Sequence, residues 1–270
     1  KDVKLPEELT TSVETLEADT LTVLSDLNHA SQKGLQTIFD CSVGRSTVNH
    51  PLGGRYQLTP TEASVQKLPV QHGVTHTASV MAQGFNPYVA EWSPYHGAAY
   101  AVIEATARLV ATGANWSKAR FSYQEYFERM DKQAERFGQP VAALLGSIEA
   151  QIQLGLPSIG GKDSMSGTFE ELTVPPTLVA FGVTTADSRK VLSPEFKVAG
   201  ENIYYIPGQA LAAEIDFDLI KSNFAQFEDI QAGHKVTSAS AVKYGGVVES
   251  LALATFGNHI GAEVTLPELE

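Results

Sequence analysis

The residues best suited to chemistry form one short run, Gly160 to Gly167, which reads GGKDSMSG. Small residues allow backbone N–H groups to face phosphate oxygens, and Lys162 adds a positive charge. The run is not a Walker A loop, because its spacing from Gly155 brings the lysine one position late, and Asp163 stands where a serine or threonine would hold Mg²⁺. The spacing alone leaves two interpretations open, a phosphate-binding loop and a tight turn.

The single cysteine and the histidines are weaker candidates. Cys41 has no histidine partner in a recognisable catalytic pattern, so we predict a small buried hydrophobic side chain. His72 and His76 have a spacing that could bind a metal on a helix, but the residues around them do not favour a helix. His96 lies in the first turn of a predicted helix, where we expect core packing or a capping contact.

Two further features have a structural and a chemical interpretation. Gly53-Gly54-Arg55 allows the backbone to approach a ligand closely, or simply makes a loop within the turn-rich stretch 44–62. Glu104 and Arg108 are four residues apart on one helical face. That spacing favours an ion pair within the helix over a metal-binding carboxylate.

The elements that must position these residues alternate between helices and strands. Ser93-Pro94 is a strong helix start, and the helix is expected to continue to a stop at Gly113. Residues 123–137 and 141–154 predict two more helices, separated by Gly138-Gln139-Pro140. The apolar run 178–184 predicts a buried strand. Beyond a polar boundary, we expect strands near 202–206, 235–238 and 262–266 and a helix over 246–256, so the class is α/β or α+β.

Composition limits the possible functions. The chain has 270 residues, of which 43% are hydrophobic, and a formal net charge of −12, which argues against wrapping a nucleic-acid backbone. No apolar run approaches the length needed to span a bilayer, and the N-terminal stretch lacks the apolar core of a signal peptide. With one cysteine and no disulfide framework, we expect a cytoplasmic protein without nucleic-acid or membrane partners. Both ends look cut, which suggests a piece of a longer chain.

Taken in order, several runs resemble the phosphoribosylformylglycinamidine synthase family. The resemblance covers about residues 25–266 and looks like the second, aminoimidazole ribonucleotide synthetase-like half of the long form. It implies a synthetase-like N-terminal domain over 31–187 and part of the matching C-terminal domain over 195–270. The composition of residues 1–30, rich in Thr, Glu, Asp and Leu, predicts a linker arm before them. The runs that carry the resemblance are FDCSVGRSTV from Phe39, GFNPY from Gly84, SPYHG from Ser93, GGKDSMSG from Gly160, VPPT from Val174 and SPEFK from Ser193.

The resemblance implies an activity and a set of partners. The family uses ATP and glutamine-derived ammonia to convert formylglycinamide ribonucleotide to its amidine, and the partners implied are the first synthetase-like half and the glutaminase domain. The glycine run matches the family segment that touches nucleotide and substrate in the main cleft, with Gly161, Lys162 and Ser164 as contacts and Asp163 beside them. The family's catalytic histidine and glutaminase cysteine have no match here, so no catalytic residue is assigned.

A second nucleotide site of the family, which holds ADP with Mg²⁺, is expected to be degenerate in this chain. Glu104 matches one metal ligand of that site by resemblance, but the other three positions are Ala78, Arg108 and Ala241. Two lost carboxylates and an arginine in place of an amide would oppose Mg²⁺ binding. The resemblance thus implies ATP and Mg²⁺ in the full enzyme, with no metal site and no tightly bound cofactor in this piece.

Two alternatives to the enzyme piece remain open. One is a non-catalytic half that organises the β-barrel shared with the first half and binds no nucleotide. The other is a different ligase or kinase of the same superfamily, against which the SPYHG and GGKDSMSG runs weigh. We expect the 270-residue chain to be inactive alone, and its exposed sheet edge makes a homodimer a reasonable expectation.

Overall fold

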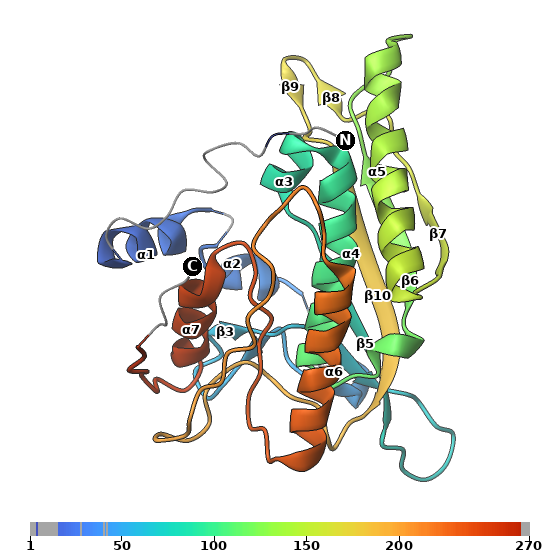
Figure 1. The fold of residues 1–270 in the computed structure, drawn as a ribbon. Coiled ribbons are helices and arrows are strands. Elements are labelled where there is room, and N and C mark those ends of the chain that lie inside the picture. Colours follow the sequence, from blue (N-terminus) through green and yellow to red (C-terminus); the bar gives the residue numbers. More distant parts are fainter. Residues whose placement is uncertain (1–3, 5–15, 28, 40, 42, 266–270) are drawn as a thin grey trace.

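A six-stranded sheet carries the glycine run at one edge and is covered by helices on one face (Figure 1). The computed structural model describes residues 4, 16–27, 29–39, 41 and 43–265. The elements in chain order are α1 Leu16–Ser25, α2 Lys33–Gln36, η2 Val43–Arg45, β1 Thr47–Asn49, β2 Leu52–Gly53, β3 Thr59–Pro60, β4 Ser64–Lys67, β5 Thr77–Gly84, α3 Pro87–Trp92, α4 Pro94–Ala111, η3 Trp116–Lys118, β6 Arg120–Tyr126, α5 Ala134–Leu154, β7 Ser158–Lys162, β8 Thr168–Phe169, β9 Leu172–Thr173, β10 Thr177–Asp187, α6 Phe217–Gly233 and α7 Gly246–Phe256.

The sheet is mixed, with the strand order β1-β4-β5-β10-β6-β7. Its long central strand β10 is antiparallel to both β5 and β6. The edge strand β7 is parallel to β6, because the whole of α5 lies between them in the chain and returns it to the same end of the sheet. The run 178–184 predicted as a strand is confirmed as the middle of β10.

Helix α4 is the centre of the core. It contacts β5 and β10 on one side, and α5 and α6 elsewhere on its surface. Its alanines let the backbones approach closely: a Cβ atom on Gly84 of β5 would lie 2.0 Å from the Ala101 carbonyl oxygen. Likewise, a Cβ atom on Gly146 of α5 would lie 1.9 Å from the Tyr95 carbonyl oxygen. Glycine is therefore required at both contacts.

Local capping signals explain where α3 and α4 begin. The Asn86 side chain accepts hydrogen bonds from the backbone N–H groups of Tyr88 and Val89. The Ser93 hydroxyl accepts one from the N–H of His96, and Pro94 occupies the first turn. These are the N-cap contacts that free helix N–H groups need, so the predicted start of α4 is confirmed.

The segment after η3 differs from the expectation of a helix over 123–137. Residues 120–126 form β6, with Phe121, Tyr123 and Glu125 buried on one face and their neighbours on the other. The alternation of aromatic and polar residues outweighs the helical preference of the glutamines and glutamates. The helix α5 begins only at Ala134, and it continues without a break through Pro140. The prediction that residues 138–140 interrupt it was wrong.

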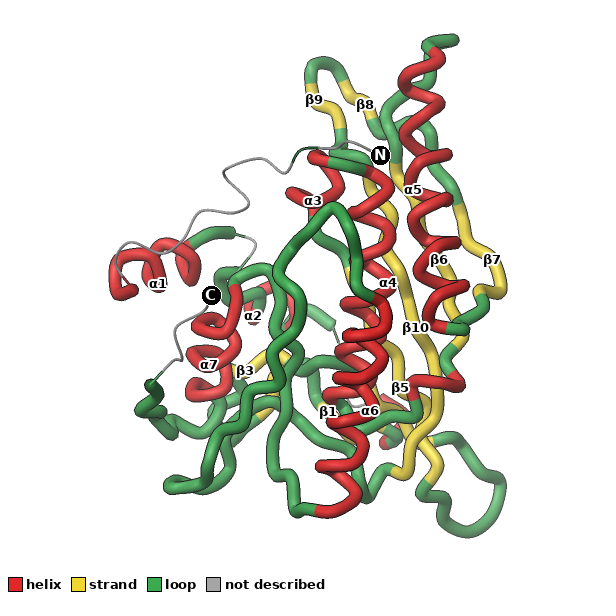
Figure 2. The backbone as a smooth tube through the Cα atoms, viewed as in Figure 1, coloured by secondary structure: helices red, strands yellow, loops and turns green. Residues whose placement is uncertain are grey.

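The last third of the chain holds two helices, α6 and α7, joined by long irregular segments (Figure 2). The helix over 246–256 is confirmed. The strands expected near 202–206 and 235–238 do not form, and of the strand expected near 262–266 the described residues 262–265 are not in a strand either. No strand in the described residues lies beside these segments to complete a ladder. Tyr204, for example, is 81% exposed.

The leading segment is only partly within the described residues. Helix α1 covers Leu16–Ser25 within the linker arm predicted over 1–30, of which residues 1–3, 5–15 and 28 lie outside the described part. Among the helices that the structure describes, none combines the length and the apolarity of a membrane span.

We predict that Gly146→Ala destabilises the chain, because the new methyl group would meet the Tyr95 carbonyl and push α5 away from α4. Overpacking of this kind costs about 1–3 kcal/mol. Gly138, in the same helix, has open space around its Cα atom. Gly138→Ala is therefore the matched control, with a gain of up to about 1 kcal/mol from helix propensity. Urea unfolding of both variants checks this, and equal effects would contradict it.

Candidate functional site

The glycine run begins as part of strand β7. Gly160, Gly161 and Lys162 pair with Ser122, Tyr123 and Gln124 of β6. A Cβ atom on Gly161 would lie 2.6 Å from the Tyr123 carbonyl oxygen, so only glycine allows this approach. Gly160 has φ +138°, a conformation that glycine alone adopts easily. Both glycines are thus explained by the geometry of the strand.

After Lys162 the chain leaves the strand but stays tied to the sheet. The Ser164 N–H donates to the Glu125 carbonyl (3.0 Å), and the Ser164 carbonyl accepts from the Phe127 N–H (2.8 Å). The Gly167 N–H donates to the Phe127 carbonyl (2.9 Å). These bonds continue the β6–β7 pairing past its end. The Ser164 and Ser166 hydroxyls lie 3.3 Å apart at the surface of this loop.

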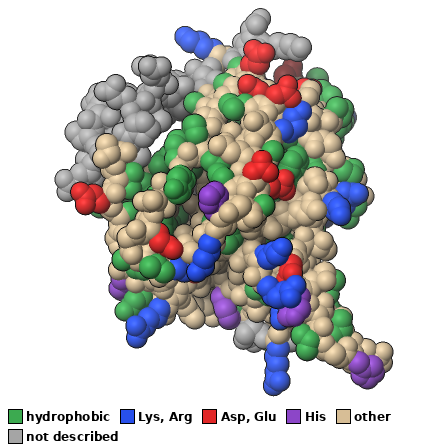
Figure 3. All heavy atoms as spheres, turned by 60° about the horizontal axis from the view of Figure 1, so that its bottom comes forward, with side chains coloured by type: hydrophobic (Ala, Val, Ile, Leu, Met, Phe, Trp, Pro, Cys, Tyr) green, Lys and Arg blue, Asp and Glu red, His purple; other side chains and the backbone are tan. Residues whose placement is uncertain are grey.

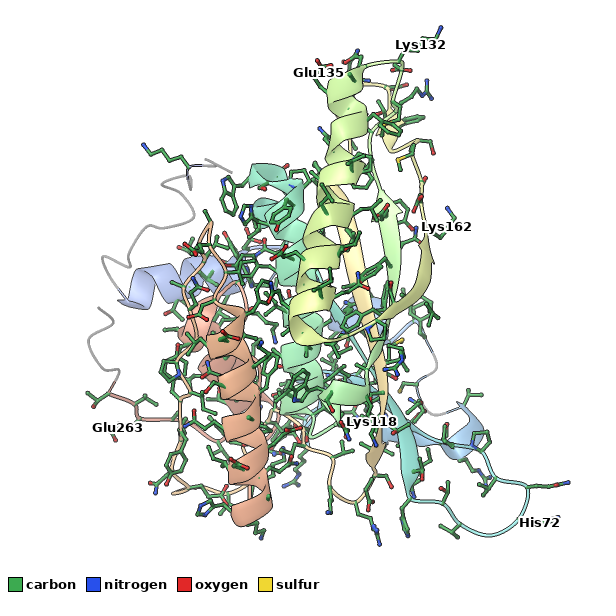
Figure 4. All side chains as sticks on the ribbon, turned by 45° about the vertical axis from the view of Figure 1, so that its right-hand side comes forward. His72, Lys118, Lys132, Glu135, Lys162 and Glu263 are labelled. Atoms are coloured by element: carbon green, nitrogen blue, oxygen red, sulfur yellow. The ribbon has the colours of Figure 1, made fainter. Side chains whose placement is uncertain are left out.

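A shallow hollow of about 320 Å³ lies beside the run on the uncovered face of the sheet. The Gln124 amide of β6 donates a hydrogen bond to the Lys162 carbonyl of β7 (2.9 Å), which holds these two strands together at the base of the hollow. Lys162 points outward from β7 (Figure 4), and its Nζ reaches only the carbonyl of Asp163 (3.0 Å). Among the described residues no carboxylate is paired with it. The hollow is lined by Ser122, Tyr123, Gln124, Ile159, Gly160, Gly161, Lys162 and Phe181.

On the other face of the sheet, two carboxyl groups meet beneath the run. Glu125 is 2% exposed, and its Oε1 atom is buried without a hydrogen-bond partner in the described part of the chain. Burial, the charge of Asp163 and a hydrogen bond with the Asp163 carboxyl together raise the pKa of Glu125 to about 7. Asp163 itself is exposed. The side chains of Lys162 and Asp163 therefore lie on opposite faces of the sheet.

A second group of charges joins three segments far apart in the chain. Glu62 is 4% exposed; its Oε2 lies 3.2 Å from Arg108 Nε and its Oε1 lies 2.9 Å from Lys243 Nζ. Glu104 Oε1 lies 3.7 Å from Arg108 Nη1, and its Oε2 accepts from the Phe85 N–H. Burial raises the pKa of Glu104, and the nearby Arg108 and Lys243 oppose that rise. The four side chains form a balanced set of two carboxylates and two cations.

The structure brings together only some of the residues expected at the degenerate metal site. Glu104 and Arg108 meet as the spacing indicated, and Ala241 is buried two residues before Lys243. Ala78 is elsewhere: it pairs with Lys67 and Ala186 at the opposite end of β5 from Phe85. Glu62, just before β4, supplies the second carboxylate instead. The sequence reasoning missed Glu62 and Lys243, although an acid directly before a strand was a signal available for the first.

Glu62 and Arg108 also form part of the wall of a larger hollow, of about 580 Å³, between residues 36–51 and the uncovered face of β4 and β5. On the face shown in Figure 3, positive side chains lie in small groups among acidic and neutral ones.

The glycine pair at 53–54 allows two backbone segments to pack closely. A Cβ atom on Gly54 would lie 2.2 Å from the Gly257 backbone, at the end of α7. The neighbouring N–H groups of Tyr56 and Arg55 donate to the Gly257 carbonyl (2.9 Å) and the Asn258 side chain (2.8 Å). Of the two interpretations, the loop is supported, because the close approach is to another backbone segment.

The remaining candidates are resolved by their surroundings. Cys41 is exposed, with its Sγ 3.3 Å from His50 Nδ1, so the prediction of a buried side chain was wrong. The reason is that its segment lies over the open face of the sheet. His72 lies in a protruding loop (Figure 4), and neither His72 nor His76 is part of a helix, as expected. His96 is buried, 2.8 Å from the Ser93 hydroxyl. No group of three or more metal-binding side chains is found among the described residues.

The fold has counterparts among solved structures. Over 91% of the chain it is similar to solved structures of Thermotoga maritima PurL, with a TM-score of 0.60 at 18% identity for the complex with AMPPCP and 0.59 at 17% for the complex with ADP. The chain covers 38% and 37% of those two chains. The aminoimidazole ribonucleotide synthetase-like fold expected from the sequence is therefore confirmed.

The curated relatives point to a particular family. The chain is 23% identical over 93% of its length to the phosphoribosylformylglycinamidine synthase subunit PurL of Picrophilus torridus, and 25% identical over 98% to that of Thermoplasma volcanium. It spans 35% and 36% of the length of these relatives. No family model matches the chain. The resemblance to phosphoribosylformylglycinamidine synthase is thus confirmed along nearly the whole chain.

We predict that Lys243→Met destabilises the chain by about 1–2 kcal/mol, because Glu62 would be left buried with Arg108 as its only counter-charge. Lys221→Met is the control, since Lys221 pairs with Asp218, whose side chain is 92% exposed. That change should leave stability unaltered. Thermal unfolding measures both, and an unaffected Lys243→Met variant would show that the charge cluster adds no stability.

Proposed function

We propose that the chain is the second synthetase-like half of a phosphoribosylformylglycinamidine synthase. The enzyme would use ATP and glutamine-derived ammonia to convert formylglycinamide ribonucleotide to its amidine. The observation that supports this best is the similarity to PurL subunits along 93–98% of the chain. In this proposal residues 31–187 are the N-terminal domain and residues 195–270 begin the C-terminal domain. The first synthetase-like half and the glutaminase domain supply the rest of the machinery.

The glycine run supplies one wall of the nucleotide and substrate cleft in this proposal. Lys162 is exposed and has no carboxylate paired with it in the described part of the chain. Its Nζ can therefore neutralise a phosphate at no cost to an existing ion pair. The Ser164 hydroxyl can donate a hydrogen bond, and Gly161 lines the hollow without a side chain, so a ligand there can reach the backbone of the strand. Asp163 faces Glu125 and supports the run from behind.

We propose further that the Glu62–Arg108 cluster has replaced a metal site with fixed cations. A divalent cation would need the carboxylates that Arg108 and Lys243 already neutralise. Because its charges are balanced internally, the cluster fits the alternative of a non-catalytic half that binds no nucleotide. The glycine run, by contrast, retains the features of a ligand contact. The two regions need not share a role.

Lys162→Ala is expected to weaken ATP binding about tenfold, because a charge-assisted contact to phosphate would be lost. Titration calorimetry with ATP and Mg²⁺ on this chain assembled with the first half measures the effect. Lys118→Ala is the control, since Lys118 is an exposed lysine in η3, outside the run. Unchanged ATP affinity in Lys162→Ala would refute the contact, and the absence of binding in the parent assembly would favour the purely structural half.

Removal of the two fixed cations is expected to create metal binding. In the double variant Arg108→Asn, Lys243→Ala, the Glu62 and Glu104 carboxylates lose their counter-charges, and an amide oxygen is added beside them. Mg²⁺ at millimolar concentration should then raise the melting temperature of the double variant and leave that of the parent chain unchanged. An equal response of the two proteins would contradict the replacement of a metal by side-chain cations.

A further inference from the structure

The Glu125 and Asp163 carboxyl groups form a pair that the proposed ligand contacts do not use. They meet on the helix-covered side of the sheet, while Lys162 and the hollow lie on the other side. A buried carboxylate facing a second carboxylate is unfavourable unless a proton lies between them. Glu125 is the buried member, at 2% exposure, and Asp163 is the member that belongs to the glycine run.

The backbone around the pair makes it a mechanical support for the run. The Glu125 carbonyl accepts from the Ser164 N–H, so the same residue holds the loop by its main chain and faces Asp163 by its side chain. Lys162, between the strand and Asp163, donates its Nζ to the Asp163 carbonyl. A movement of Asp163 would therefore displace the residue that carries the positive charge.

In the part of the chain that the structure describes, neither carboxyl group of the pair forms an ion pair with a basic side chain. Tyr123, two residues before Glu125 on the same face of β6, has a buried hydroxyl without a hydrogen-bond partner in the described residues. Lys162 directs its ammonium group to a backbone carbonyl. The charged group that acts on Glu125 is Asp163, which raises its pKa. A proton shared by the two carboxyl groups would relieve the repulsion between them.

We propose that Glu125 is a positioning residue, which shares a proton with Asp163 and so holds Lys162 and Ser164 in place from the back of the sheet. When that proton is lost, the two carboxylates repel, and the loop from Gly160 to Gly167 loses its support. The consequence for ligand binding rests on the proposed function; the support of the loop does not.

The pH dependence of stability tests the pair. The pKa of Glu125 is raised to about 7 in the folded chain from an ordinary value of 4.5, so the stabilising proton is fully present below about pH 4.5 and is lost as the pH rises through 7. Glu125→Gln keeps the shape and neutrality of the protonated acid. The variant should therefore lack the fall in melting temperature between pH 5 and 8 that the parent shows.

Loop-specific measurements separate this inference from the proposed function. Amide hydrogen exchange over residues 160–167, corrected for the intrinsic pH effect, should accelerate several-fold between pH 6 and 8 in the parent chain and stay constant in Glu125→Gln and Asp163→Asn. Glu171→Gln, at an exposed acid near β9, is the control and should behave as the parent. ATP affinity measured over the same range should fall in parallel, but absent ATP binding would refute only the proposed function.

Two outcomes would contradict the proposal that Glu125 and Asp163 share a proton. One is the same pH dependence of exchange in Glu125→Gln as in the parent chain, which would place the titration elsewhere. The other is stabilisation of the parent by Mg²⁺ or Ca²⁺ that disappears in Glu125→Gln, which would show that the carboxyl groups hold a cation and not a proton.

Discussion

The close approach of α4 to its neighbours is the constraint on which the other elements depend. Alanines on the helix and glycines opposite it, at Gly84 and Gly146, bring backbone against backbone at contacts that no larger residue would permit. That approach fixes β5 and β10 on one side and α5 on the other. Since α5 alone connects β6 to β7, the position of the glycine run follows from the packing of α4.

The parts of the fold that the sequence predicts well are those decided by local signals. The start of α4 is decided by Ser93 and Pro94, and the buried run of β10 is decided by its apolar β-branched residues. Strand β6 was misread because its glutamines and glutamates favour a helix in isolation, whereas the burial of Phe121, Tyr123 and Glu125 is decided by the sheet. The chain after residue 190 offered short apolar runs but no neighbouring strand to pair with them.

The candidate sites also divide into those that local sequence signals predict and those that only the folded chain shows. The glycine run and the Glu104–Arg108 pair lie within short stretches, and their spacing was visible. The ion pair between Glu62 and Lys243 joins residues 181 positions apart, and only the folded chain shows it. The Glu125–Asp163 pair joins two segments connected through α5, and its significance comes from burial, which no spacing rule provides. Long-range electrostatics therefore added what local pattern did not contain.

Strand β7 ends the sheet on one side, and its outward edge has no neighbouring strand in the described residues. The same strand carries Lys162, and Ile159 on it is 80% exposed. Any protein segment that pairs with this edge would order the backbone of the glycine run at the same time. Assembly and ligand binding would then be linked equilibria: the factor by which assembly raises the ligand affinity equals the factor by which the ligand strengthens assembly.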